Sequence, residues 1–297
     1  MIERSLELRG PLDLAATLAP LVHGRGDRTI RLARGEALLA FLTPDGPATM
    51  HLRQVTATGL AVRAWGPGAD RAAADAASLV GEDDRPELFV AAHPLLRDLQ
   101  RRHPGLRLPR TGRVFHALVP SVLEQKVTGT EAFRSYAALL RRYGEPAPGP
   151  GGLVLPPTPE ALAGLPYHAY HPLGVERRRA EVIRHAAMRS AWLDASRSSE
   201  EAGARLRSLA GIGPWTAAEV VRSAFGDPDA VSIGDYHVPD TVAWALAREP
   251  RANDERMLEL LEPYRGQRGR VQRLLEVGRI SAPRRGPRMV PRSIATI

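Results

Sequence analysis

The first third of the chain alternates apolar and polar residues, the pattern typical of strands with one buried face. Segments with this alternation cover residues 5–10, 29–35, 36–44, 48–59 and 60–66. Helical spacing appears after a proline start in 11–22 and again in 72–79. Glycine and proline turns at 24–26 and 44–46 separate the segments. This part therefore predicts a small, mostly antiparallel sheet with one or two helices, ending at a polar hinge over 81–86.

Beyond the hinge the apolar period becomes helical. The pattern predicts helices over 87–103, 113–143, 158–165, 175–191, 199–209, 214–225, 240–248, 253–262 and 266–278, with a Pro/Gly loop over 145–152. We therefore expect an α+β protein with an N-terminal β-rich domain (1–84) and a helical domain (85–282). A basic tail (283–297) is expected to be disordered.

Composition narrows the classes of partner. The chain has 297 residues, 43% of them hydrophobic, which is enough for a sizeable core, and a formal charge of +8. An excess of positive charge favours a polyanion, with nucleic acid as the first candidate, although genome bias toward arginine and the basic tail contribute to the total. The absence of cysteine excludes disulfides, thiolate zinc sites and an iron–sulfur cluster. No apolar run reaches the length of a signal peptide or a membrane span, so we expect a cytoplasmic monomer with no membrane partner.

The sequence Gly211-Ile212-Gly213 lies between two predicted helices, and Pro214 occupies the first position of the second helix. Glycines allow positive φ and close backbone approach, so the free amides of such a hairpin can bind one phosphate. Ile212 would then point inward and join the two helices. The alternative is an ordinary helix C-cap followed by a new helix.

Two stretches resemble a known family: LAGIGPWTA at 209–217, and VSIGDY at 231–236 after the second helix. They resemble the helix-hairpin-helix (HhH-GPD) superfamily of base-excision DNA glycosylases, and most closely its DNA-3-methyladenine glycosylase II branch. Supporting stretches are PGLRLP at 104–109, VLEQKV at 122–127 and GVERRRA at 174–180. The resemblance covers most of the chain. It implies base-excision repair of damaged, alkylated bases in double-stranded DNA, in association with the nucleoid.

The resemblance gives the catalytic role to Asp235. A fixed carboxylate suits the reaction, because cleavage of an N-glycosidic bond builds positive charge on the sugar. The alternative is that Asp235 is a helix N-cap or a turn residue. Asp240 is expected to be the cap instead.

Relatives that also cleave the DNA backbone carry a lysine two residues after the second glycine of the hairpin. Trp215 occupies that position here, and the one lysine in the sequence, Lys126, lies elsewhere. An indole has no nucleophilic amine, so we expect hydrolysis by water without lyase activity.

The family resemblance also supplies the base pocket and the DNA contacts. It places Trp215 and Tyr236 in the base pocket, Gly211, Ile212 and Gly213 on the DNA backbone, and Gln125 with Lys126 in the gap that base flipping leaves. A core position for Trp215 and a solvated helical face for Gln125 and Lys126 are the alternatives. The sequence departs from the branch at Lys126, where an apolar residue is common, and at Glu219 and near Glu276, where aromatic residues are expected.

No cofactor is expected, apart from a sodium or potassium ion at the backbone carbonyls of Arg207, Leu209 and Ile212, which the resemblance implies. Two alternatives to alkylation repair stay open. One is the same chemistry on oxidised or deaminated bases, and the other is a protein that binds damaged DNA without turnover.

Overall fold

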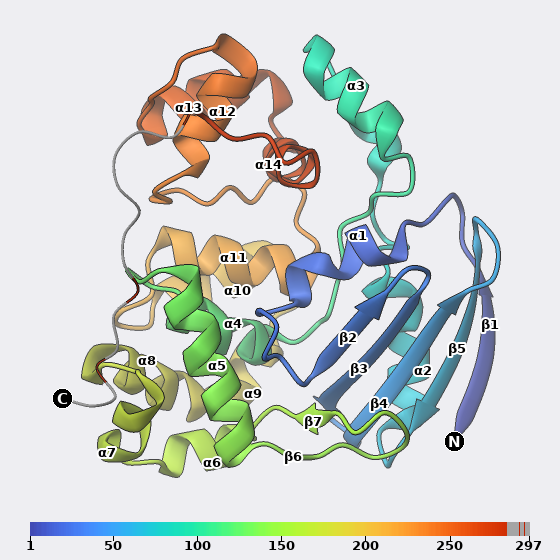
Figure 1. Ribbon diagram of the computed structural model, residues 1–297, viewed down its shortest axis with the longest axis vertical. Coiled ribbons are helices and arrows are strands. Elements are labelled where there is room, and N and C mark those ends of the chain that lie inside the picture. The colour runs from blue at the N-terminus through green and yellow to red at the C-terminus, as the bar shows by residue number, and fades with distance from the viewer. Residues whose placement is uncertain (284–290, 292–293, 295–297) are drawn as a thin grey trace.

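The computed structural model describes residues 1–283, 291 and 294. Its N-terminal part is an antiparallel sheet in the strand order β1-β5-β4-β3-β2 (Figure 1). The strands are β1 (Ile2–Glu7), β2 (Ile30–Ala33), β3 (Glu36–Thr43), β4 (Gly46–Gln54) and β5 (Gly59–Trp65). The turn between β3 and β4 requires Gly46, whose φ is 119°. Each strand overlaps its predicted segment, but β1 begins and ends three residues earlier than the predicted segment 5–10, and β4 ends at Gln54 rather than at residue 59.

One face of the sheet is covered by two helices, α1 (Leu14–Leu18) and α2 (Ala69–Leu79), with the 3₁₀ turn η1 (Ala19–Leu21) after α1. Met50 and Leu52 on β4 are fully buried beneath them, as the period of two requires. On the other face Ala40 packs against Leu153 and Leu155. Leu155 lies in β7 (Val154–Leu155), which pairs with β6 (Glu145–Pro146) in a short hairpin, and Leu153 directly precedes β7.

The first helical group surrounds α4 (Val114–Leu123), whose residues are apolar on nearly all sides and largely buried. A helix of this composition is stable only inside a core. Around it pack α5 (Gly129–Tyr143), α6 (Pro159–Gly164), α7 (Tyr167–Tyr170), η3 (His171–Leu173), α8 (Arg177–Ala187), α9 (Ser190–Asp194), α10 (Ser199–Arg207) and α11 (Pro214–Phe225).

The second helical group lies beside α11 and holds a separate apolar cluster (Figure 1). It contains η2 (Pro86–Leu88), α3 (Pro94–Arg102), α12 (Val238–Ala247), α13 (Asp254–Leu261), η4 (Glu262–Tyr264) and α14 (Arg268–Val277). The chain passes from the first group to the second through residues 226–237, so this connection lies where the two groups meet.

The predicted α+β class is confirmed, and three predicted helices need correction. The single helix over 113–143 is wrong: α4 ends at Leu123, and α5 begins after Thr128. The helix over 175–191 is divided into α8 and α9, and the helix expected from residue 87 begins only at Pro94. Proline at the first helical position fixes that last start.

The domain limits at residues 84 and 282 stay predictions. The predicted disordered tail, 283–297, lies outside the described residues except at 283, 291 and 294. Among the helices of the described ranges, none has the length and apolar character needed to span a bilayer.

Candidate active site

The predicted hairpin joins α10 to α11, and its backbone has the expected form. Gly211 has a φ of 89°, and a Cβ at this position would collide with the side chain of Val182 on α8. Ile212 is 6% exposed and packs into the core of the first helical group, which confirms its inward direction. Gly213 is extended (φ −98°, ψ −177°), and Pro214 opens α11. The hairpin thus presents a helix N-terminus at the surface, while its DNA-binding role stays a prediction.

Gln125 and Lys126 lie in the turn between α4 and α5. Gln125 is fixed to the hairpin, because its Nε2 donates to the carbonyl oxygen of Gly211 (3.1 Å) and to Oγ1 of Thr216 (2.9 Å). Lys126 is exposed and has a φ of 54°, which is uncommon for a residue with a side chain. The alternative assignment of these two residues to a solvated helical face is therefore wrong, and their insertion into the DNA stack stays a prediction.

The helix break at 124–128 has a local cause. Thr128 and Glu131 form a capping box, in which each side chain accepts a hydrogen bond from the backbone N–H of the other residue. The sequence Thr-Gly-Thr-Glu is the signal that could have revealed this start.

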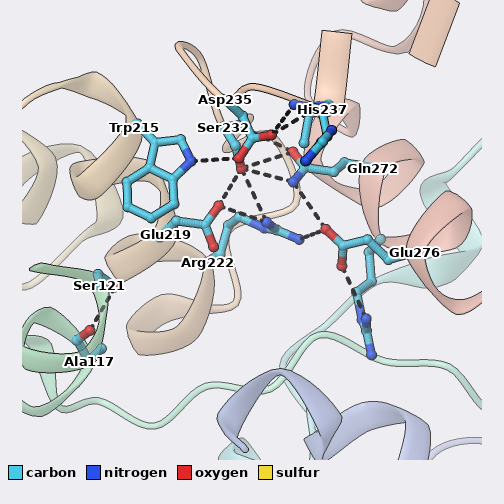
Figure 2. A network of polar contacts seen from close by, with 12 residues as sticks. Ala117, Ser121, Trp215, Glu219, Arg222, Ser232, Asp235, His237, Gln272 and Glu276 are labelled. Atoms are coloured by element: carbon cyan, nitrogen blue, oxygen red, sulfur yellow. Dashed lines mark hydrogen bonds and ion pairs between the residues drawn. The ribbon is translucent and has the colours of Figure 1, made fainter. Parts of the chain in front are cut away.

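Asp235 lies in the connection between α11 and α12, and its carboxylate is held on both oxygens. Trp215 Nε1 donates to Oδ2 (2.9 Å), while the backbone amides of His237 and Val238 donate to Oδ1 at 2.7 and 3.0 Å. Figure 2 shows the carboxylate between the indole and the start of α12. Asp235 therefore combines a fixed orientation with a position at a positive helix end.

The expected helix cap at Asp240 is wrong. This residue lies inside α12, and its Oδ1 accepts from the backbone amide of Ala252 (2.9 Å). Asp235, rather than Asp240, accepts hydrogen bonds from the amides at the start of α12, as the alternative assignment of Asp235 to a helix cap or turn expects.

The two predicted pocket aromatics are placed differently. Trp215 is half-buried beside Asp235 and uses its N–H as a donor. Tyr236 is 85% exposed, and its ring meets His237 edge-on with centroids 4.8 Å apart. The structure brings Trp215 to the carboxylate and leaves Tyr236 directed outward.

A cavity of about 540 Å³ lies between the sheet and helices α4, α5, α11 and α14. Its volume is within the range of roughly 300–1,000 Å³ typical of small-molecule sites. Apolar residues from the sheet and α5 contribute, such as Phe41 and Phe133, but the helical wall is charged. Its ionisable residues include Glu124, Glu219, Glu276, Arg113, Arg222 and Arg273.

Arg222 links two of these carboxylates across the helical groups. Its Nη1 donates to Glu219 Oε1 (3.0 Å) and its Nη2 to Glu276 Oε1 (2.8 Å), while Arg273 Nη1 binds the other oxygen of Glu276 (3.1 Å). Burial raises the pKa of Glu219 despite Arg222. Burial would also raise the pKa of Glu276, but Arg222 and Arg273 outweigh it and lower that pKa below its usual value.

The same network reaches the connection that carries Asp235 (Figure 2). Ser232 Oγ donates to Glu219, and Ser232 N donates to Gln272 Oε1 (3.2 Å). The backbone amide of Asp235 in turn donates to the carbonyl of Ser232 (3.1 Å). Ser232 is fully buried, so the turn before Asp235 is anchored to both α11 and α14.

Sequence reasoning identified Glu219 and Glu276 only as departures from an aromatic pattern and missed Arg222, Ser232 and Gln272. The available signal was the spacing: Glu219 and Arg222 are three apart on α11, and Gln272 and Glu276 are four apart on α14. Which helices face each other could not be read from that spacing.

His116 on α4 also lines the cavity. Burial, and then the charge of Arg113, lower its pKa to about 4, so the imidazole is neutral near pH 7. Among the described residues its Nε2 has no hydrogen-bond partner.

Comparison with known proteins finds relatives whose names describe DNA repair enzymes. The probable bifunctional transcriptional activator/DNA repair enzyme AlkA of Mycobacterium tuberculosis is 32% identical over 232 residues, which are 75% of this chain and 45% of that protein. DNA-3-methyladenine glycosylase 2 of Escherichia coli is 33% identical over 139 residues, 45% of this chain and 49% of that protein. The chain thus spans about half the length of the curated relatives it matches. No protein-family model matches it.

A similar solved structure is that of the 3-methyladenine DNA-glycosylase from Archaeoglobus fulgidus. It superposes with a TM-score of 0.76 at 20% identity and covers 93% of this chain and 98% of that chain. The likeness confirms the fold, and the names of the relatives agree with the predicted family.

Proposed function

We propose that this chain, which belongs to the DNA-3-methyladenine glycosylase II branch of the helix-hairpin-helix glycosylase superfamily, hydrolyses the N-glycosidic bond of alkylated bases in duplex DNA. The observation that carries the proposal is the Asp235 carboxylate, fixed by the indole N–H of Trp215 on α11 and by two backbone amides at the start of α12. The names of the relatives support the substrate class.

Asp235 acts on the developing positive charge of the sugar. As the base leaves, the deoxyribose approaches an oxocarbenium ion, and a carboxylate already in place stabilises it without reorganisation. The donors from Trp215, His237 and Val238 prevent rotation of the side chain. Water attacks the sugar, and an abasic site remains. A cationic alkylated base leaves readily because departure neutralises it.

The hairpin binds the backbone of the DNA strand. The hairpin amides and the N-terminus of α11 are suited to a phosphate oxygen, and the charge of +8 favours DNA in general. The base must leave the stack to reach Asp235. Lys126 lies next to Gln125, which is bonded to the hairpin, so its side chain is suited to the vacated gap.

A monovalent ion would suit the carbonyls of Arg207, Leu209 and Ile212. The turn is closed by the amide of Ile212, which donates to Leu209 O (3.1 Å). Along the described chain, no backbone amide outside the helices donates to the carbonyls of Arg207 or Ile212. The carbonyls of Arg207 and Ile212, together with the second lone pair of the Leu209 carbonyl, are suitable ligands for sodium or potassium, which would add positive charge next to the DNA phosphate.

The proposed reaction stops at the abasic site. Trp215 stands where lyases of the superfamily have their lysine, and its N–H is already bonded to Asp235. Without an amine there, no Schiff base forms at the hairpin.

The test is base release from duplex DNA containing 7-methylguanine, scored as strand breaks before and after alkali. We expect breaks only after alkali. Asp235→Asn should lower the rate by about 100-fold or more, as expected for loss of a preorganised charge, with little change in affinity for abasic-site DNA. Asp45→Asn, which alters another turn aspartate, is the matched control. Full activity of Asp235→Asn, or breaks without alkali, would contradict the proposal.

A further inference from the structure

The charged cavity begins at Glu219, one helical turn along α11 from Trp215, the residue that holds the Asp235 carboxylate. Trp215, which holds Asp235, and Glu219, which lines the cavity, are four residues apart on α11 and lie on the same face. Four residues advance an α-helix by about 6 Å. A purine that has its sugar at Asp235 can therefore extend its far edge toward Glu219.

Two carboxylates in the cavity wall have unused acceptor capacity. Glu219 Oε1 accepts from Arg222 and Ser232, but Oε2 accepts no hydrogen bond from the described residues. Glu124, at the end of α4, has one described side-chain contact, between its Oε1 and His23 Nδ1 at 3.5 Å. Glu276 differs, because both of its oxygens are bound by arginines.

Glu219 also lies in unfavourable electrostatic surroundings. Burial raises the pKa of Glu219, Arg222 opposes this, and the charges of Glu276 and Glu124 raise it further. A ligand with positive charge and N–H donors would relieve both the desolvation and the repulsion.

We propose, on the basis of the proposed function, that Glu219 determines which bases are released. Glu219, assisted by Glu124, does so by accepting hydrogen bonds from the extruded base. The cavity then selects cationic purines that carry an exocyclic amino group. It disfavours neutral bases that carry carbonyl oxygens but no amino group, because an ionised carboxylate accepts hydrogen bonds only and repels another acceptor.

The test compares two lesions in the same duplex under single turnover, 7-methylguanine (cationic, with an amino group) and hypoxanthine (neutral, without one). Glu219→Gln keeps the size of the side chain and an oxygen for Arg222 and Ser232, but presents an amide to the cavity. We expect 7-methylguanine release to fall about tenfold or more, the effect of a hydrogen bond to a charged group, while hypoxanthine release is unchanged or faster.

Glu124→Gln should move the ratio of the two rates in the same direction, and it carries the test if Glu219→Gln does not fold. Glu160→Gln, an exposed glutamate on α6, is the matched control and should leave the ratio unchanged. Thermal melting and affinity for abasic-site DNA establish that each variant is folded and binds.

The outcomes separate the inference from the function on which it rests. Wild-type protein that releases neither base refutes the proposed function. Wild-type release with an equal loss of both activities in Glu219→Gln refutes the specificity role alone. Selective loss of hypoxanthine release would also overturn it, because Glu219 would then be a proton donor to neutral bases.

Discussion

The bond between Trp215 and Asp235 can be tested by replacing Trp215 with phenylalanine. An aromatic ring remains, but the N–H that donates to Asp235 Oδ2 at 2.9 Å is lost with the second ring of the indole. Oδ1 keeps the amides of His237 and Val238, so the carboxylate stays in place with freer rotation.

The size of the expected effect follows from the one hydrogen bond to a charged group that Trp215→Phe removes. Hydrogen bonds to charged groups contribute about 1.5–3 kcal/mol, and the two remaining donors favour the lower end of that range. A loss of about 1.5 kcal/mol in the transition state corresponds to roughly tenfold slower base release. Because Trp215 is only half-buried and phenylalanine keeps an aromatic ring at this position, thermal stability should change little.

The assay is single-turnover release of 7-methylguanine with enzyme in excess, so that DNA binding does not limit the rate. Trp192→Phe is the control: that ring is 41% exposed and stacks on Arg205 with the guanidinium carbon 5.0 Å from the ring centroid. An unchanged rate in Trp215→Phe would show that the indole does not orient Asp235. A parallel loss of affinity for abasic-site DNA would show that Trp215 acts through binding instead.

Two further predictions concern the hairpin and the cavity. Gly213→Glu should fold, because its φ is negative and an added Cβ meets nothing within 4 Å. It should weaken binding to every duplex and reduce by about 1 the slope of log affinity against log salt concentration. Gly164→Glu, where an added Cβ also meets nothing within 4 Å, is the control and should not change that slope. An unchanged slope in Gly213→Glu would exclude the hairpin as a phosphate contact. The pKa of His116 in the folded protein is about 4, below the ordinary 6.5. Because the unfolded chain therefore takes up this proton first as the pH falls, the free energy of unfolding is highest above pH 6.5 and decreases toward pH 4. Denaturant unfolding of His116→Leu should lack roughly 3 kcal/mol of the wild-type decrease over that interval, and identical pH profiles would contradict the buried neutral imidazole.

The elements set by short-range chemistry could be predicted from the sequence. The hairpin at 211–213, the start of α11 at Pro214 and the alternating strands depend on glycine φ angles, a proline position and a period of two. The break at 124–128 was missed because the apolar period of α4 continues into α5 almost in phase, while a four-residue capping box decides the boundary.

The surroundings of Asp235 were only partly predictable. The sequence indicated a carboxylate in a turn with Trp215 nearby, but not that the indole would donate to it or that Tyr236 would point outward. Contacts among α11, α14 and the turn at Ser232 join residues up to 54 positions apart. They depend on how the two helical groups pack, which no local pattern specifies.

The buried ion network is better explained by the turn that it holds than by stability alone. Arginines and glutamates out of water rarely stabilise a fold more than apolar residues of the same volume, because desolvation offsets their attraction. Here Glu219, Arg222 and Gln272 bind the hydroxyl or the amide of Ser232, and the carbonyl of Ser232 accepts from the amide of Asp235. An apolar replacement could fill the space but would leave the polar atoms of Ser232 without partners. The network therefore couples the wall of the cavity to the turn that carries the Asp235 carboxylate.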